Sequence, residues 1–324
     1  MPPTEQTSDS TALVDRWRER VARLLIDRRI HRAVDQPRLT LVVIAYRSDP
    51  TDLRLCLESI DRACRKAGGA IERMVADCGG NERCHHIITE LCDTELVLLP
   101  DCTLNEARNA VIAWSEGELV MLIDDDGILE DDAVAAMLRH FEASDVVGVR
   151  GRIRYKRQRY LTALATHYNR GDEVVDEILD VEGHMALRRD HTLRAGGFDE
   201  SLFGGEGLLI TYRLLHHHPG MRALYAPDVI MRHDFFHDWK HFVRKSAVFT
   251  NQRGALVDHF GQEPGFEEFV EAHFLRKRKR APLTVDERLA CRGLKIIRSV
   301  IQLATRIRRR GRPEAAAYAS PRRG

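Results

Sequence analysis

The chain has 324 residues, of which 44% are hydrophobic, so it can bury one large core and carry extensions. Its net charge is +1, but residues 276–324 contain 16 Lys/Arg and 3 Asp/Glu, which leaves the first 275 residues at −12. No segment reaches the about 20 apolar residues of a transmembrane helix, and the polar first ten residues predict no signal peptide. The seven scattered cysteines favour reduced thiols in a cytoplasmic protein over a disulfide framework.

The N-terminal segment is predicted to be a short tail followed by an amphipathic helix. Residues 1–10 are polar, and we expect them to be disordered. From residue 11 onward apolar residues recur at helical spacing with Arg and Asp between them, which predicts a helical segment over 11–36. We expect its apolar side to pack on the main domain rather than on a membrane.

Strands and helices alternate five times in the next part of the chain. Short apolar runs predict buried strands at 39–46, 71–77, 96–99, 118–124 and 145–150. Helical patterns lie between them, among them 51–66, 104–114 and 130–141. This alternation is typical of βαβ units with right-handed crossovers. The predicted fold class is therefore α/β, with a mostly parallel central sheet flanked by helices.

The second half has a looser pattern. Short strands are predicted at 184–187, 221–226 and 228–233, and helices at 208–217, 235–260, 265–276 and 285–309. We expect one catalytic domain over 37–260, a basic helical extension over 261–310 and a disordered tail over 311–324.

The most informative stretch is 118–127, an apolar strand that ends in Asp124, Asp125, Asp126 and Gly127. In open α/β sheets, ligands bind outside the carboxyl ends of the strands. Three adjacent carboxylates repel one another unless a cation or an array of donors is present, and oxygen ligands suit Mg²⁺ or Mn²⁺. A solvated acidic turn before a helix is the alternative interpretation.

Four motifs in order resemble family 2 glycosyltransferases with the GT-A fold, and the resemblance runs from about Leu39 to Phe249. The motifs are VVIAY at 42–46, VADCGG at 75–80, ARN at 107–109 followed by GELVMLIDDD at 117–126, and GGFDE at 196–200 followed by Gly205 and Glu206. The resemblance implies an inverting enzyme that moves a sugar from a nucleotide-diphosphate sugar to an acceptor hydroxyl. It also implies a UDP-sugar as the expected donor and Mn²⁺ or Mg²⁺ as the cofactor.

The resemblance also implies roles for individual residues. Asp77 matches the carboxylate that accepts from the nucleotide base, Arg108 the arginine near the base and phosphates, and Asp124 the aspartate that holds the ribose hydroxyls. The whole nucleotide-sugar site implied in this way consists of Ala45, Tyr46, Asp77, Arg108, Asp124 and Asp125.

The metal ligands implied by the resemblance are Asp126, the second carboxylate of the D-x-D motif, and His233. The histidine follows a predicted strand, where relatives often place a metal-contacting histidine. A hydrogen-bonded core histidine is an equal alternative for His233.

The fourth motif departs from the family. Relatives usually have Glu-Asp after the glycine, with the Asp as general base, whereas this chain has Glu206 and Gly207, and the later acidic position is Leu209. The candidate bases are therefore Glu206 and Glu182. A non-catalytic relative that only binds sugar nucleotides is the rival function. A dinucleotide oxidoreductase is disfavoured, because Tyr46-Arg47-Ser48 replaces the glycine fingerprint after the first strand.

The C-terminal segment combines the basic run 276–280 with a predicted helix that carries an apolar stripe. We expect the stripe to pack on the catalytic domain and the basic residues to make a salt-sensitive, peripheral contact with an anionic membrane. No nucleic-acid partner is expected, because aromatic residues do not interleave with the basic run. The expected partners are thus a nucleotide-sugar donor, an acceptor whose identity the sequence does not give, and the inner face of the membrane.

Overall fold

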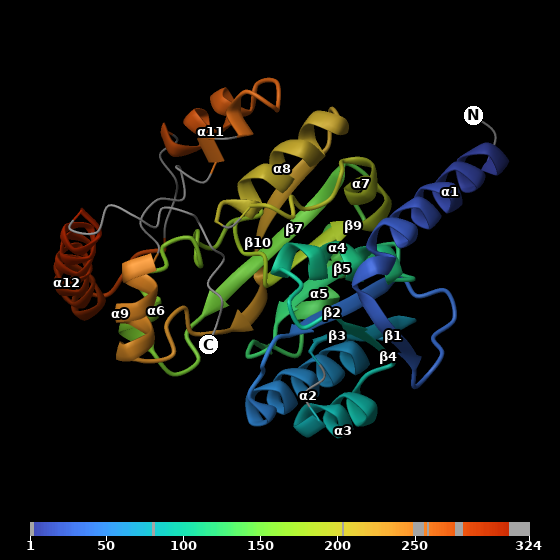
Figure 1. The fold of residues 1–324 in the computed structure, drawn as a ribbon, viewed down its shortest axis with the longest axis horizontal. Coiled ribbons are helices and arrows are strands. Elements are labelled where there is room, and N and C mark those ends of the chain that lie inside the picture. Colours follow the sequence, from blue (N-terminus) through green and yellow to red (C-terminus); the bar gives the residue numbers. More distant parts are fainter. Residues whose placement is uncertain are drawn as a thin grey trace.

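The computed structural model describes residues 3–79, 82–202, 204–248, 256–257, 259–275 and 281–310. Ten strands of this part form one sheet in the order β1-β4-β3-β2-β5-β9-β7-β10-β6, with β8 paired to β10 (Figure 1). The strands are β1 Leu25–Ile30, β2 Leu39–Ala45, β3 Ile71–Cys78, β4 Thr94–Leu98, β5 Leu119–Asp124, β6 Ile128–Leu129, β7 Val146–Arg154, β8 Val175–Asp176, β9 His184–Arg188 and β10 Arg222–Arg232.

The sheet is mixed but mostly parallel, as the sequence predicts. Strands β4, β3, β2 and β5 run parallel to one another, and so do β7 and β10. Strand β9 lies antiparallel between β5 and β7. The carboxyl ends of β2, β3 and β5 therefore meet at one edge, where a ligand site is expected.

Helices cover both faces of the sheet. The helices are α1 Pro3–Val21, α2 Pro50–Ala67, α3 Glu82–Leu91, α4 Leu104–Trp114, α5 Ala133–His140, α6 Arg159–Thr162, α7 Arg189–Arg194, α8 Glu206–His217, α9 Trp239–Val248, α11 Phe266–Leu275 and α12 Val285–Arg310. Helices α2, α3 and α5 share one hydrophobic cluster with the sheet. Helices α1, α4, α7 and α8 share a second cluster on the opposite face.

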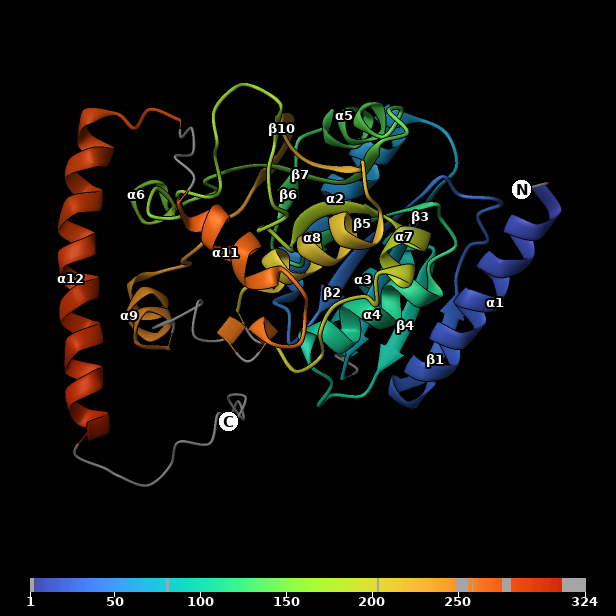
Figure 2. The same cartoon turned by 90° about the horizontal axis from the view of Figure 1, so that it is seen from above.

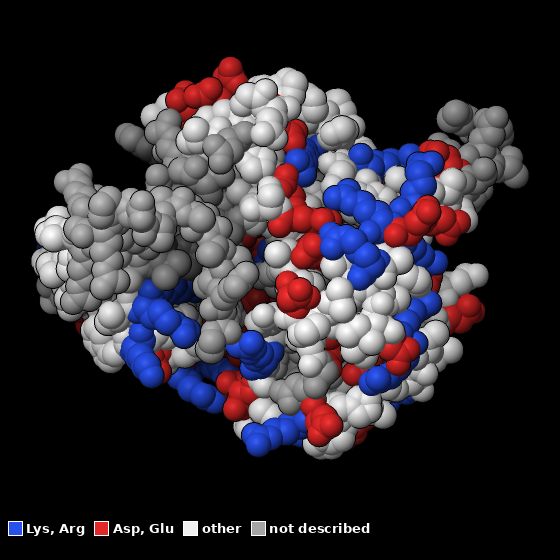
Figure 3. Space-filling model, viewed as in Figure 1, with Lys and Arg blue, Asp and Glu red and all other residues white. Residues whose placement is uncertain are grey.

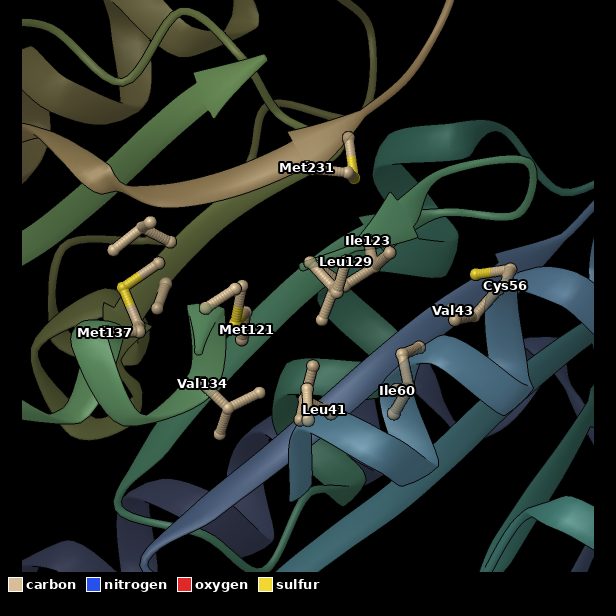
Figure 4. Packing of buried hydrophobic residues seen from close by; sticks show 14 of the residues in the cluster. Leu41, Val43, Cys56, Ile60, Met121, Ile123, Leu129, Val134, Met137 and Met231 are labelled. Atoms are coloured by element: carbon tan, nitrogen blue, oxygen red, sulfur yellow. The ribbon is translucent and has the colours of Figure 1, made fainter. Parts of the chain in front are cut away.

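The alternation of side chains along each strand divides the core between these two faces. In β2, Leu41 and Val43 belong to the cluster under α2 and α5, whereas Val42 belongs to the other cluster. Figure 4 shows Leu41 and Val43 close to Ile60 of α2, with Met121 of β5 on the other side of Leu41. Strands buried on both faces give the continuous apolar runs seen in the sequence.

The N-terminal prediction is partly wrong. Residues 3–10 belong to helix α1, and the helix ends at Val21 instead of continuing to residue 36. Residues 25–30 form strand β1, which pairs antiparallel with β4. The pairing satisfies backbone groups on the outer edge of β4, a tertiary effect that outweighs helical spacing in a short charged segment. The packing of the helix is confirmed, because Leu13 and Trp17 are buried against the domain.

Other boundaries differ locally. The helix expected from residue 130 begins at Ala133, because Ile128–Leu129 pair with β10 as strand β6. The two strands expected over 221–233 are one strand, β10, with a register shift between Ala226 and Ile230. Within the helix expected over 235–260, the structure gives α9 at Trp239–Val248, and residues 249–255 and 258 lie outside the described part.

The terminal helices α1 and α12 lie at opposite ends of the molecule (Figures 1 and 2). The expectation that the apolar stripe of the last helix packs on the domain is mostly wrong, since Leu289, Ile296 and Val300 are more than 60% exposed, whereas Ile301 packs against a buried cluster. A different face of α12, with Cys291 and Leu294, is buried. The run 276–280 and the tail 311–324 lie outside the described residues. In the described part, no helix combines the length and the apolar character needed to cross a bilayer.

Candidate active site

The structure contains a cleft of about 1330 Å³ at the carboxyl ends of the central strands. It brings together seven of the ten residues that the sequence singles out. These are Arg108, Asp124, Asp125, Asp126, Glu182, Glu206 and His233. The other three lie at the ends of neighbouring strands, outside the lining of this cleft. Ala45 and Asp77 are paired across β2 and β3, next to the β5 end that carries Asp124, and Tyr46 follows Ala45.

Asp126 is held by two histidines from the segment after β10. Its Oδ1 lies 3.1 Å from Nε2 of His233, and its Oδ2 lies 3.4 Å from Nδ1 of His237. Burial alone would raise the pKa of Asp126, but the hydrogen bond from His233 and the positive charges of His233, His237 and Lys156 lower it to about 2. Asp126 is therefore a carboxylate at any physiological pH.

His233 is buried and hydrogen-bonded, and it also lines the cleft, so it combines features of the two predicted roles. Its Nε2 lies 3.1 Å from Asp126 and 3.6 Å from Oδ2 of Asp124, and its Nδ1 lies 3.0 Å from the hydroxyl of Tyr168. Burial favours the neutral ring, but the hydrogen bond to Asp126 and the charges of Asp124 and Asp126 outweigh it and raise the pKa of His233.

Asp125 has a different environment from its two neighbours. The hydroxyl of Ser48, in the loop after β2, donates to its Oδ2. Burial raises the pKa of Asp125 to about 6, against the effect of the Ser48 hydrogen bond and with a contribution from the charges of Asp126 and Asp124. The three adjacent aspartates are thus not equivalent.

Gly183 allows Asp124 to take its position. The N–H of Asp124 donates to the carbonyl of Gly183 at 2.9 Å. A Cβ on Gly183 would lie only 1.9 Å from Oδ1 of Asp124. The glycine is therefore required by this close approach.

The donor atoms at the β5 end fit a divalent cation shared with a diphosphate. Asp126 and His233 offer an oxygen and a nitrogen ligand, with Asp124 beside them. The described residues contain no group of three or more His, Cys, Asp or Glu side chains arranged to hold a metal by themselves. Mg²⁺ commonly uses one or two carboxylates and completes its coordination with substrate phosphates and water. Two protein ligands and a phosphate-bearing substrate meet that requirement.

Arg108 is fixed on the wall of the cleft by helix α4. Its Nη1 donates to Oδ1 of Asn105 at 2.8 Å, and its guanidinium lies 5.3 Å from the ring centroid of Phe198. Asn109 also exchanges hydrogen bonds of 2.9 Å with the backbone of Phe198. The motif residues of α4 thus hold the loop at 196–202 as well as the arginine.

Glu182 belongs to the segment before β9, and its side chain contacts the N-terminus of α8. Its Oε1 accepts from the N–H of Gly207 at 2.7 Å. Burial raises the pKa of Glu182 to about 7, the negative charge of Glu206 adds to the increase, and Arg108 opposes it. A carboxyl group that titrates near neutrality is suited to accept a proton during turnover.

Gly207 is a structural requirement of the same contact. A Cβ at this position would lie 2.2 Å from the carbonyl oxygen of Leu179 and 2.8 Å from Oε1 of Glu182. The segment before β9 therefore occupies the space that a side chain at position 207 would need. Glu182 comes from this segment, and its carboxyl group contacts Gly207 in the cleft wall.

Several residues of the cleft were not predicted from the sequence. Tyr168 lies in a region without clear periodicity, and Lys245 and Arg298 lie far along the chain from the motifs. Lys245 Nζ lies 3.7 Å from the ring centroid of Phe235, and burial lowers its pKa to about 8. His237 could have been found, because it follows His233 by four residues.

Comparison with known proteins agrees with this architecture. Residues 40–196, slightly less than half of the chain, match the family model described as glycosyl transferase family 2. The comparison with curated proteins gave no match. One solved structure that matches is the mannosyltransferase PcManGT from Pyrobaculum calidifontis in complex with GDP-Man and Mn²⁺. The two chains are 18% identical, with a TM-score of 0.51, and the match covers 90% of this chain and 83% of that chain.

A likeness at this level of identity shows the fold, which is that of the GT-A glycosyltransferases. The family match over residues 40–196 and this fold together support a glycosyltransferase enzyme.

Proposed function

We propose that the protein is an inverting glycosyltransferase that moves a sugar from a nucleotide-diphosphate sugar to an acceptor hydroxyl with Mn²⁺ or Mg²⁺. The observation that carries the proposal is the composition of one cleft. Asp124, Asp126 and His233 lie on one wall, and Glu182 beside Arg108 lies in the same cavity. Metal, diphosphate and proton transfer thus each have suitable side chains.

On the donor side, Asp126 and His233 would hold the cation, which neutralises charge on the leaving diphosphate when bound. Asp124 is assigned to the ribose and Arg108 to the phosphates, with Asp77, Ala45 and Tyr46 on the nucleotide. Asp125, whose Oδ2 accepts from Ser48, is a supporting member of this group.

On the acceptor side, Glu182 is the preferred base and Glu206 the alternative. The acceptor hydroxyl gives its proton to the Glu182 carboxylate while its oxygen bonds to the anomeric carbon. The bond from that carbon to the diphosphate breaks on the opposite face, which inverts the configuration. The pKa of about 7 for Glu182 and its fixed contact with Gly207 favour it.

A non-catalytic protein that only binds sugar nucleotides is the second candidate, because Gly207 replaces the usual aspartate. Both candidates bind the donor, and only the transferase releases nucleoside diphosphate from it. The identity of the donor nucleotide is a separate question for both candidates: UDP is our expectation, whereas the similar structure was bound to GDP-Man.

A panel of UDP- and GDP-sugars with Mn²⁺, scored by thermal stabilisation and then by nucleotide release, tests this function. We expect one nucleotide series to stabilise the protein only with the metal and to be turned over slowly by water or faster with an acceptor. Stabilisation without any nucleotide release under acceptor screening would favour the binding protein. No stabilisation by any member would contradict both candidates.

For its location, we propose the cytoplasm, with peripheral contact at the inner face of the membrane through the basic C-terminal segment. The charge distribution supports this, since residues 276–324 carry 16 of the 50 Lys/Arg of the chain. On the face shown in Figure 3, side chains of both signs are interspersed over the described body. A broad basic surface is therefore not a property of that face.

A further inference from the structure

Helix α12 exposes a continuous apolar stripe to solvent. Each of its six side chains is 60–67% exposed, although large aliphatic residues are usually buried. At about 100° per residue, the six positions fall within about 60° of one another around the helix axis. We call this set the outer stripe: Val285, Leu289, Ile296, Val300, Leu303 and Ile307.

The opposite side of α12 is anchored to the protein. Leu294 belongs to a buried cluster with Phe236 and Phe242, against which Ile301 packs. At the start of the helix, Arg159 of α6 lies 2.9 Å from Glu287. The orientation of the helix is thus fixed by its inner side, and the outer stripe faces outward as a consequence.

Three cationic residues of α12 lie beside the stripe. Residues 285–310 contain eight Lys/Arg and two Asp/Glu. Arg288, Arg292 and Lys295 are exposed and fall on one flank of the stripe by helical geometry. The two acidic residues, Asp286 and Glu287, both contact Arg159. The exposed face is therefore apolar and cationic.

The apolar and cationic side chains on this face favour an anionic lipid surface as the binding partner of the stripe. A second copy of α12 would add another cationic flank to the contact, and like charges at an interface cost free energy. A bilayer with anionic lipids accepts the apolar side chains and attracts the cations. No described helix is suited to span the bilayer, so α12 would lie on it.

We propose that the outer stripe of α12 is a membrane-docking surface and that the helix lies flat in the interface of an anionic membrane. This identifies the surface behind the membrane contact of the proposed function, on which it rests, but it does not require the transfer reaction. On its inner side α12 contributes Arg298 and Gln302 to the lining of the cleft. A helix is about 10–12 Å thick, so the cleft lies about one helix diameter from the lipid, which suits an acceptor resident in the membrane.

Co-sedimentation of the full chain with vesicles tests the docking surface, without nucleotide sugar or metal. The vesicles contain phosphatidylcholine alone or phosphatidylcholine with an equal amount of phosphatidylglycerol. We expect binding to the anionic vesicles that weakens with salt, and little binding to the neutral ones. The variant Ile296→Gln/Val300→Gln/Leu303→Gln removes three stripe side chains while keeping good helix formers, and we expect it to bind at least about tenfold more weakly.

The matched control removes three exposed aliphatic side chains elsewhere, Ile26→Gln/Ile30→Gln/Val174→Gln. It should bind vesicles as the parent protein does. The charge variant Arg288→Gln/Arg292→Gln/Lys295→Gln should lose up to about fivefold per cation at low salt. Sedimentation equilibrium without vesicles measures self-association of the same proteins.

Three results would overturn the proposal. The first is unchanged vesicle binding by the stripe variant, and the second is equal binding of the parent protein to neutral vesicles. The third is a dimer of the parent protein that the stripe variant converts to a monomer, which would make the stripe an interface between copies. Donor binding, measured separately in solution, reports on the proposed transferase function whichever result is found.

Discussion

At the level of single residues, three consecutive aspartates differ because their neighbours differ. Asp126 is paired with His233 and His237, and its pKa is lowered to about 2, whereas the pKa of Asp125 is raised to about 6 by burial. The same residue type is therefore a carboxylate with a lowered pKa at one position and a buried group with a raised pKa at the next.

The variant Asp126→Asn should abolish metal-dependent donor binding, because it removes the one carboxylate assigned to the cation. Loss of a second-shell partner already costs about 10–100-fold in metal affinity, and loss of a ligand should cost more. Asp125→Asn should be milder, since Ser48 is its hydrogen-bond partner. Calorimetry with UDP or GDP and Mn²⁺ measures both, and equal affinities for Asp126→Asn and the parent protein would contradict the metal assignment.

The variant Glu182→Gln should lower turnover by about 10²–10⁴-fold with donor binding nearly intact. We expect kcat/KM of the parent protein to increase as pH rises through about 7, the pKa of Glu182, and the variant to lose this increase. Glu206→Gln is the matched comparison from the same cleft. If Glu182→Gln kept the increase of kcat/KM near pH 7 and Glu206→Gln lost most of its turnover, the base would be Glu206 and not Glu182.

A stability measurement distinguishes the loss of turnover in Glu182→Gln from a loss of folded protein. Folding raises the pKa of Glu182 from 4.5 to about 7, so the folded state binds the proton more tightly than the unfolded state. The contribution of Glu182 to stability is therefore lost as pH rises from 4.5 to 7. Above pH 7, Glu182→Gln should unfold at a temperature no lower than that of the parent protein.

At the level of elements, the N-terminus of α8 is set by the segment that approaches it. The backbone at Leu179 and Asp180 lies against Gly207, and Glu182 accepts from its N–H. The departure from the family pattern at 207 is thus a property of how two elements pack, which the sequence of α8 alone does not reveal.

Gly207→Asp, which restores the usual family residue, should not restore a base. Its Cβ would contact the Leu179 carbonyl, so the variant should be destabilised by about 1–3 kcal/mol, as for overpacked sites, and less active. Gly207→Ala is the control for the clash without the charge and should be destabilised similarly. An increase of transfer activity in Gly207→Asp above the parent protein, measured by nucleotide release, would show that the native chain lacks a base.

The sequence predicted the elements whose signal is local. The strand that ends at Asp124 and the helix that begins after Asp49 follow from apolar runs and capping residues, and the structure contains both. Strand β1 could not be predicted, because it is stabilised by pairing with β4, more than 60 residues away.

The candidate site likewise contains residues that the motifs predict and residues that only tertiary packing places there. The motifs predicted Asp126 and Arg108 as residues of one cleft, and the structure places both in its lining. Tyr168 and Lys245 enter the cleft only through tertiary packing. A side chain at position 207 would clash with the backbone of residues 179–180, a contact that no pattern within a motif reports.

At the level of the whole molecule, the two terminal helices have opposite relations to the domain, at opposite ends (Figure 2). Helix α12 is fixed by its inner side and leaves its outer stripe exposed. Helix α1 buries its apolar side, and its Trp17 donates from Nε1 to the carbonyl of Leu193 at 3.0 Å. Amphipathic spacing is thus common to both helices, but only α1 uses it to complete the core.

Trp17 also supports the wall of the candidate site. A Cβ on Gly197 would lie 2.8 Å from Cη2 of Trp17 and 2.7 Å from Oδ1 of Asn109, so the indole and the amide both pack closely against this glycine. Asn109 in turn holds the backbone of Phe198, whose ring faces Arg108. Trp17 is therefore linked to Arg108 in the cleft wall through Asn109 and Phe198.

The variant Trp17→Ala should lower the free energy of unfolding by about 3–5 kcal/mol, the usual cost of removing a buried Phe or Trp side chain. It should also weaken donor binding, because the loop that faces Arg108 loses its support. Arg16→Ala changes the neighbouring exposed position and is the matched control, for which both quantities should remain within about 0.5 kcal/mol of the parent protein. Urea unfolding gives the stability and calorimetry gives the affinity.

A Trp17→Ala protein as stable as Arg16→Ala would show that the packing of α1 does not contribute to the stability of the domain. A destabilised protein with unchanged donor affinity would restrict α1 to the core and separate it from the site.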